Sequence, residues 1–365
     1  MIPVLDVAAT DGAARTGTVE TSRGHFQVPC FMPVGTRGAV RALDASDLDG
    51  LGAEVVLANT YHLMARPGAD VVAALGGLHR FTGFDGHMLT DSGGFQVHSL
   101  QPDVDDDGVT FRSVYDGSRM RLTPEDAVAV QELLGADIQM VLDVCSGLPA
   151  SRDDLQLAVT RTAHWAQRAR AAHRRRDDQA LFGIVQGGCE TDLRVESARR
   201  TVACDFDGYA VGGLSVGETR ADMLDALEVT VPELPAGRLR YLMGVGDPVG
   251  IVEGVARGID MFDCVAPTRA ARHGTAWTWA GKLSLRQASR ARLDGPIDPE
   301  CGCSTCARYS QGYLRHLVVV GETTAARLVS IHNLSFVFDL MRALRAAVAS
   351  GTTAALCEQV ARFWG

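Results

Sequence analysis

The chain has 365 residues, a formal net charge of −9 and 46% hydrophobic residues. This apolar content excludes a disordered protein, and the length suits one large domain or two ordinary ones. No run of about 18 apolar residues occurs, so no membrane-spanning helix is predicted. The first twelve residues hold acids but no basic cluster, unlike a secretory signal, and we expect a cytoplasmic protein. The negative charge argues against a non-specific nucleic-acid coat but allows a local basic face.

Seven short apolar runs end at a polar or glycine residue, and most are followed by a stretch long enough for a helix. Runs of this kind are typical of buried parallel strands. They predict an α/β fold of the (β/α)8 TIM-barrel type, with the eighth strand near Lys282 to Arg286; a doubly wound sheet is the alternative. The runs are Val55–Ala58, His87–Thr90, Ile138–Leu142, Leu181–Val185, Tyr209–Val211, Tyr241–Met243 and Ile259–Phe262.

The chain is predicted to form one catalytic barrel domain over residues 1–365. A turn-rich stretch, Val109 to Arg121, predicts an inserted hairpin around Asp116-Gly117. After His332, apolar residues at helical spacing predict a closing helix whose stripe packs into the core. Residues 295–315 are rich in Cys, Pro and Gly, and we place a metal-binding subdomain at about 287–335.

Three cysteines crowd into six residues near the C-terminal end. Cys301, Cys303 and Cys306 are followed, 25 residues later, by His332. Three thiolates and one imidazole satisfy a tetrahedral Zn²⁺ ion, and four protein ligands leave no open coordination position. The pattern therefore predicts one structural zinc ion per chain; buried free thiols would rarely crowd so closely.

Polar residues and glycines follow the predicted strands. Because the carboxyl ends of barrel strands form the active site, these residues should converge. A single aspartate there is often only a helix N-cap, but three carboxylates and an amide together favour a site. The converging residues are Asp91, Asp143, Gln186, Gly213, Met243 and Asp263.

The side chains at these strand ends suggest chemistry at a sugar-linked purine. Two aspartates, one nucleophile and one general acid/base, are what cleavage at an anomeric carbon requires. Asp260 and Asp263 are three apart in a strand, so only one of them can face the mouth. Asp143 and Gln186 present the acceptor and donor groups that suit guanine. Residues 267–293 carry several arginines and no carboxylate until Asp294, which favours RNA contact over a merely solvated face.

Six motifs make the chain resemble a tRNA-guanine transglycosylase of the bacterial type, from Phe31–Thr36 to His332. They are Asn59–Leu63, Asp91–Gln96, Gly183–Gly188, Gly212–Glu218, Tyr241–Gly246 and Met261–Val265 with Pro267–Arg269. The resemblance implies a TIM barrel with a zinc subdomain. It also implies exchange of the wobble guanine in tRNAs with GUN anticodons, in queuosine biosynthesis, by a homodimer that uses neither ATP nor a redox cofactor.

The resemblance also implies roles for particular residues. Asp263 aligns with the nucleophile that attacks the ribose, and Asp91 aligns with the general acid/base. Phe95 and Met243 align with a pair that sandwiches the purine, and the Leu214 carbonyl with the acceptor of an aminomethyl group. The implied substrate-binding residues are Ser92, Gly93, Gly94, Phe95, Asp143, Gln186, Gly213, Leu214 and Met243. The implied RNA contacts are Gly244, Val245, Gly246, Asp247, Pro248, Val249, Gly250, Thr268, Arg269, Ala270, Ala271 and Arg272.

The incoming base is predicted to be 7-aminomethyl-7-deazaguanine (preQ1). Cys145 and Val216 resemble the form that uses preQ1, whereas Val144 stands where bacterial members commonly have Glu, so another 7-deazaguanine such as queuine stays open. A barrel glycoside hydrolase is a further alternative, although Trp and Tyr for sugar stacking are few. A non-catalytic, zinc-stabilised RNA-binding protein is the last, and retention of both Asp91 and Asp263 argues against it.

Overall fold

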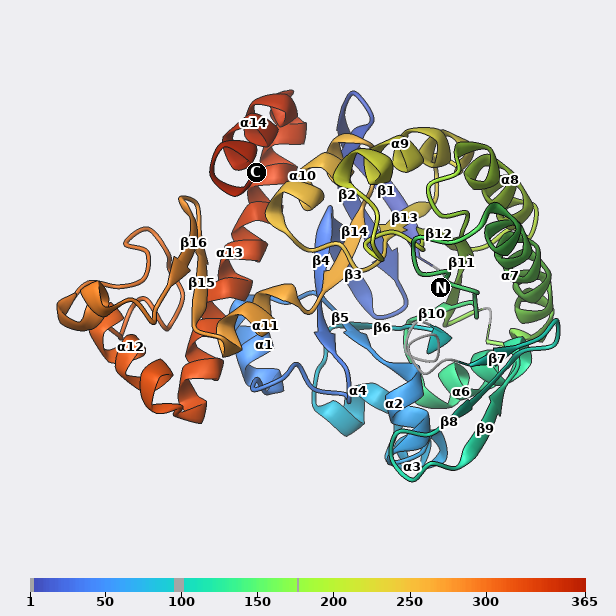
Figure 1. Ribbon diagram of the computed structural model, residues 1–365, viewed down its shortest axis with the longest axis horizontal. Helices are drawn as coiled ribbons and strands as arrows, with labels where there is room; N and C mark the ends of the chain where they lie inside the picture. Colours follow the sequence, from blue (N-terminus) through green and yellow to red (C-terminus); the bar gives the residue numbers. More distant parts are fainter. Residues whose placement is uncertain (1–2, 95–101, 176) are drawn as a thin grey trace.

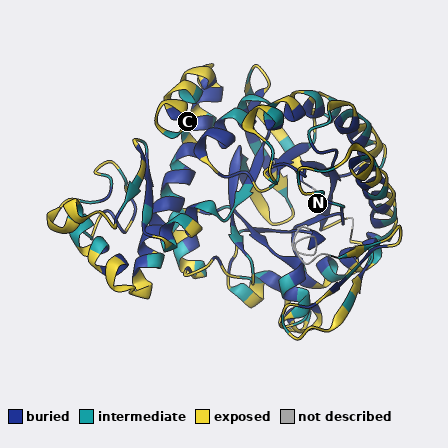
Figure 2. Cartoon of the chain, viewed as in Figure 1, coloured by how far each residue is buried: buried dark blue, intermediate teal, exposed yellow. Residues whose placement is uncertain are grey.

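The computed structural model describes residues 3–94, 102–175 and 177–365, and its centre is a closed barrel of eight parallel strands. The predicted barrel is therefore confirmed, and the doubly wound alternative is wrong. Apolar side chains fill the strands because the barrel interior and the surrounding helices bury both of their faces (Figures 1 and 2). The strands are β4 (Cys30–Gly35), β5 (Val55–Ala58), β6 (His87–Thr90), β10 (Ile138–Met140), β11 (Ala180–Val185), β12 (Gly208–Val211), β13 (Leu239–Leu242) and β14 (Met261–Cys264).

The predicted eighth strand near Lys282 to Arg286 is wrong. The barrel closes instead between β14 and β4, where Met261 pairs with Cys30 and Cys264 with Pro33. Pro33 lacks the N–H that a central strand donates, which hides β4 from a sequence pattern. Residues 281–284 form β16 (Gly281–Ser284), which pairs antiparallel with β15 (Thr275–Thr278) outside the barrel.

Helices follow most barrel strands and cover the outside of the barrel (Figure 1). Several begin at a side chain that accepts a hydrogen bond from the first turn, such as Thr123, Ser151 and Thr219. The helices up to β14 are α1 (Ala45–Leu51), α2 (Thr60–Ala65), α3 (Ala69–Ala74), α4 (Gly77–Thr82), α6 (Pro124–Leu134), α7 (Arg152–Ala172), α8 (Thr191–Val202), α9 (Arg220–Thr230) and α10 (Pro248–Ala256), with a 3₁₀ turn at Val231–Glu233.

Besides the β15–β16 hairpin, the described residues form two three-stranded antiparallel sheets outside the barrel. The predicted hairpin is confirmed as β8 (Val109–Arg112) and β9 (Arg119–Leu122), which are joined by β7 (Asp103–Val104). The sequence did not reveal the N-terminal sheet of β1 (Val4–Asp11), β2 (Ala14–Thr21) and β3 (Gly24–Val28). Arg15 of β2 reaches the amino end of β14, where its Nε and Nη2 lie 2.7 and 2.6 Å from the carboxylate of buried Asp260.

The C-terminal part of the chain forms a region beside the barrel that holds the predicted metal ligands. After β14 come α11 (Ala266–Arg272), the β15–β16 hairpin, a 3₁₀ turn at Ala288–Arg292, α12 (Gln311–Val320), α13 (Thr323–Ser350) and α14 (Thr353–Trp364). In Figure 1, α13 runs between the barrel and the region that holds α12 and the hairpin. The predicted closing helix is confirmed, since Leu334, Val337, Met341, Leu344 and Val348 are all buried.

Candidate active site

Asp91 follows β6 and is held by the start of α2. Its Oδ1 accepts hydrogen bonds from the backbone N–H groups of Thr60 (2.8 Å) and Gly93 (3.1 Å). Asn59, the N-cap of α2, donates its side-chain amide to Oδ2. Burial, with smaller contributions from the nearby carboxylates of Asp263 and Asp143, raises the pKa of Asp91 to about 7 against the backbone hydrogen bonds from Thr60 and Gly93. Asp91 can therefore exchange a proton near neutral pH.

Asp263 lies near the carboxyl end of β14. Its Oδ1 accepts two hydrogen bonds, from the Tyr241 hydroxyl (2.6 Å) and from the Gly244 N–H (2.7 Å). Burial raises the pKa of Asp263, while these two donors lower it by stabilising the anion. Oδ2 accepts no hydrogen bond from the residues that the structure describes, so it is the oxygen with free lone pairs. Asp260, three residues earlier, is committed to Arg15, as the strand alternation predicted for one of the two acids.

Asp143 and Gln186 form a polar pair beside these acids. Gln186 Nε2 donates to Asp143 Oδ2 over 2.6 Å, and the Ser92 hydroxyl lies 3.4 Å from Oδ1. Burial raises the pKa of Asp143 to about 6. Gly213 has a φ of +67°, and a Cβ there would lie 2.2 Å from Gln186 Oε1. Only glycine therefore brings this backbone against the pair.

A buried arginine supports the two loops behind this pair. Arg194 of α8 is 0% exposed, and its guanidinium donates to four backbone carbonyls: Gly188 (2.7 Å), Gly212 (2.8 Å), Val185 (3.2 Å) and Gly213 (3.3 Å). Burial lowers its pKa to about 10, so it stays charged at neutral pH. It fixes the backbone on both sides of Gln186 and at Gly213.

The remaining predicted site residues differ in how far they are exposed to solvent. Leu214 is buried and Met243 half-buried, while Phe95 lies outside the described residues. In the two predicted RNA segments, Gly244, Asp247 and Arg269 are exposed and Ala270 and Arg272 half-buried. The other members of these segments pack inward: Val245, Gly246, Pro248, Val249, Gly250, Thr268 and Ala271.

Sequence reasoning missed the residues that hold the acids in place. Asn59, Thr60 and Tyr241 hold the acids through contacts that no spacing rule encodes. The same is true of Arg194, which supports the backbone around Gln186. One signal was available for Tyr241, since it stands at the carboxyl half of a strand next to the strand of Asp263.

The predicted metal ligands lie together at the start of the C-terminal region. The ligand atoms of Cys301, Cys303, Cys306 and His332 all lie within 4.8 Å of one another. His332 Nδ1 is 3.3 Å from Cys306 Sγ and 3.8 Å from Cys303 Sγ, and Nε2 is 2.9 Å from the Trp277 carbonyl. The carbonyl fixes the tautomer that leaves Nδ1 as the ligand atom. This donor set fits a tetrahedral metal ion.

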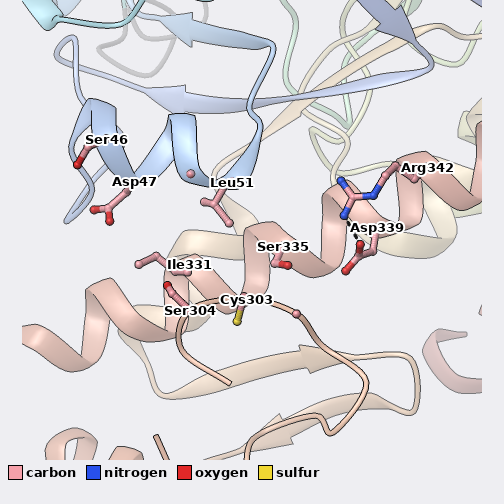
Figure 3. A pocket seen from close by; sticks show the side chains of 11 residues that line it. Ser46, Asp47, Leu51, Cys303, Ser304, Ile331, Ser335, Asp339 and Arg342 are labelled. Carbon is pink, nitrogen blue, oxygen red and sulfur yellow. Dashed lines mark hydrogen bonds and ion pairs between the residues drawn. The ribbon is translucent and has the colours of Figure 1, made fainter. Parts of the chain in front are cut away.

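A cavity of about 350 Å³ lies beside the metal ligands, between α1, residues 302–304 and α13 (Figure 3). Charged residues on its wall already have partners: Asp47 pairs with Arg327, and Asp339 pairs with Arg342. The cavity is lined by none of the acids at the barrel mouth. We therefore place the candidate active site at Asp91, Asp143 and Asp263.

The fold and the site together define an α/β-barrel enzyme with buried acids at its mouth and a Cys₃His cluster. The family model described as queuine tRNA-ribosyltransferase matches residues 10–365. A queuine tRNA-ribosyltransferase of Desulforudis audaxviator is 52% identical over 348 residues, covering 95% of this chain and 94% of the relative. That of Symbiobacterium thermophilum is 53% identical over 344 residues, covering 94% and 86%.

The chain therefore belongs to the queuine tRNA-ribosyltransferase family of tRNA-guanine transglycosylase enzymes. The predicted resemblance is confirmed. Among the helices of the described residues, none is long and apolar enough to cross a membrane.

Proposed function

We propose that this chain replaces guanine at the wobble position of tRNAs with GUN anticodons by preQ1, through a covalent Asp263–ribose intermediate. The observation that carries the proposal is the pairing of two different carboxylates at one barrel mouth. Asp263 keeps a free Oδ2, and Asp91 has a pKa of about 7. One is suited to attack carbon and the other to carry a proton.

The exchange proceeds in two displacements. Asp263 Oδ2 attacks ribose C1′, the C1′–N9 bond breaks, and guanine leaves with the electron pair and takes a proton from Asp91. The Asp91 carboxylate then removes a proton from N9 of the incoming base. That nitrogen attacks C1′ from the other side, and the bond to Asp263 breaks. The ribose therefore keeps its configuration and Asp91 regains its proton.

The base is held by the polar pair behind the acids. Asp143 accepts from N1–H and the exocyclic amine, while Gln186 and the Gly213 N–H donate to the 6-oxo group. Ser92, Gly93 and Gly94 close the pocket, Phe95 and Met243 stack on the purine, and the Leu214 carbonyl accepts from the aminomethyl group. Arg194 supports this arrangement, because its bond to the Gly212 carbonyl polarises the peptide whose N–H is Gly213.

The RNA strand lies along two segments that flank Asp263. Its proposed contacts are Gly244, Val245, Gly246, Asp247, Pro248, Val249, Gly250, Thr268, Arg269, Ala270, Ala271 and Arg272. A zinc ion held by Cys301, Cys303, Cys306 and His332 would supply structural cross-linking of a subdomain at about 287–335 within a single barrel domain. We further propose a homodimer acting on cytoplasmic tRNA.

The test is incorporation of labelled guanine into tRNA with a wobble guanine, with Asp263→Ala alongside and preQ1 as competitor. Incorporation that needs Asp263 and is blocked by preQ1 supports the proposal. Incorporation indifferent to preQ1 keeps the exchange but favours another base, such as queuine. No incorporation by a folded, zinc-loaded protein refutes the exchange, and release of free sugar from glycosides would then favour a hydrolase.

A further inference from the structure

A cluster of two arginines around one tyrosine lies beside the barrel mouth, outside the segments already assigned. Tyr115 lies in the turn between β8 and β9. The guanidinium carbons of Arg66 and Arg37 lie 4.9 and 5.5 Å from the centre of its ring. The Tyr115 hydroxyl is 2.9 Å from His62 Nδ1. We call Arg37, Arg66 and Tyr115 the arginine clamp.

The clamp is at the same end of the barrel as the carboxylates. Arg37 follows β4 and Arg66 ends α2, which follows β5, so both stand beyond the carboxyl ends of barrel strands. The first residues of α2 are those that hold Asp91. The hairpin is tied to the same helix, because the Val114 N–H donates to the Tyr61 hydroxyl over 3.0 Å.

The charges of the clamp are uncompensated. Arg37 and Arg66 are exposed, and neither forms an ion pair with a carboxylate in the part of the chain that the structure describes. The residues outside that part, 1–2, 95–101 and 176, include no acid. Many other arginines of this acidic protein are paired, including Arg121, Arg152 and Arg168. Two unpaired cations held together without an acid suit an anion.

The clamp continues a cationic edge that begins next to the nucleophile. Arg272 of α11 lies close enough to Arg41 and Arg269 for their charges to lower its pKa, after burial. Arg41 and Arg37 belong to one connection, between β4 and α1. The arginines of this edge therefore extend from α11, which follows Asp263, to Arg66 at the end of α2, whose first residues hold Asp91. An RNA strand whose reacting ribose lies between Asp263 and Asp91 would therefore have these arginines beside its path.

We propose that the arginine clamp binds phosphates of the tRNA strand beyond the wobble nucleotide, in addition to the segments 244–250 and 268–272. This inference rests on the proposed function. The guanidinium groups of Arg37 and Arg66 both lie over the Tyr115 ring. Tyr115 acts as a positioning residue that orders both cations before the RNA arrives, which reduces the entropy lost on binding.

The experiment measures binding of an anticodon stem-loop RNA with a wobble guanosine over a range of salt concentrations. In the double variant Arg37→Ala/Arg66→Ala we expect roughly tenfold weaker binding at 0.1 M salt. The slope of log affinity against log salt should fall by about 1.4, or about 0.7 per single-strand phosphate contact. In exchange assays the KM for RNA should rise while the KM for free guanine stays. Tyr115→Leu should weaken binding with little change of slope, because both charges remain, and Tyr115→Phe should bind like the wild type.

The matched control is Arg80→Ala. Arg80 is also exposed and precedes β6, at the opposite end of the barrel. The clamp is refuted if the double variant, with an unchanged melting temperature, binds RNA with the wild-type affinity and slope. It is also refuted if Arg80→Ala lowers the affinity for RNA by as much as the double variant. If the wild type binds and exchanges and the variants match it, only the clamp is refuted. If the wild type binds no RNA, the proposed function and the clamp are refuted together.

Discussion

Replacing Tyr241 by phenylalanine removes one of the two donors to Asp263 and should change the pH dependence of exchange. The lost hydrogen bond is 2.6 Å long and reaches a partly buried carboxylate. Hydrogen bonds to charged groups contribute about 1.5–3 kcal/mol, which is about 10- to 150-fold in the ratio of anion to acid. Because the hydroxyl stabilises the anion, Tyr241→Phe raises the pKa of Asp263 further above its ordinary value.

The sign of the effect on the rate depends on pH. On the acid side, fewer molecules carry the nucleophilic carboxylate, so the rate should fall by the factor above and the acid limb should move to higher pH. On the alkaline side Asp263 is ionised in both proteins. The variant should then match or exceed the wild type, since its anion is less stabilised before attack.

The assay is the initial rate of guanine incorporation between pH 5 and 9 at saturating RNA. Tyr209→Phe is the control, because Tyr209 is equally buried on the neighbouring strand β12 and its ring packs against Phe206. An equal loss of rate at every pH would refute the reasoning, because a change in the pKa of Asp263 lowers the rate only on the acid side. A shift of the acid limb in Tyr209→Phe would also refute it, because Tyr209 does not donate to Asp263.

Three further substitutions test the proton carrier Asp91, the predicted metal site and the buried ion pair between Arg15 and Asp260. Asp91→Asn should lower the exchange rate by about 10²–10⁴-fold with RNA binding kept, because an amide carries no proton; near-wild-type turnover would contradict this. Cys303→Ser should lose zinc and lower the melting temperature together, as metal analysis and calorimetry would show, whereas a wild type without zinc would disprove the site. Asp260→Asn should cost about 3–5 kcal/mol of unfolding free energy in urea, because Arg15 stays buried without its partner; a change below about 1 kcal/mol would contradict the ion pair's role.

Much of the site could be predicted because a parallel barrel brings the ends of its strands together. Asp91, Asp143, Gln186 and Asp263 follow recognisable apolar runs, so their convergence needs only the fold. The Cys₃His cluster was equally visible, since three cysteines in six residues have few other uses. These predictions depend on local pattern and on one global rule.

Other features depend on contacts between distant segments. β4 was missed because Pro33 interrupts the signal of a buried strand, and Lys282 to Arg286 took its place in the prediction. Tyr241 and Arg194 read as ordinary strand and helix residues until their partners are known. Arg15 meets Asp260 across 245 residues of sequence, a separation that periodicity does not reach.

The helix α13 links the Cys₃His cluster to the segment that follows Asp263. His332 and Asn333 are consecutive. His332 is a predicted metal ligand, and Asn333 forms hydrogen bonds with Pro267, Thr275 and Trp277, which follow Asp263 in the chain. Loss of a metal ion from this cluster would therefore loosen the segment that carries the proposed RNA contacts Arg269 and Arg272. Metal removal would then weaken RNA binding without any change in the residues that hold the base.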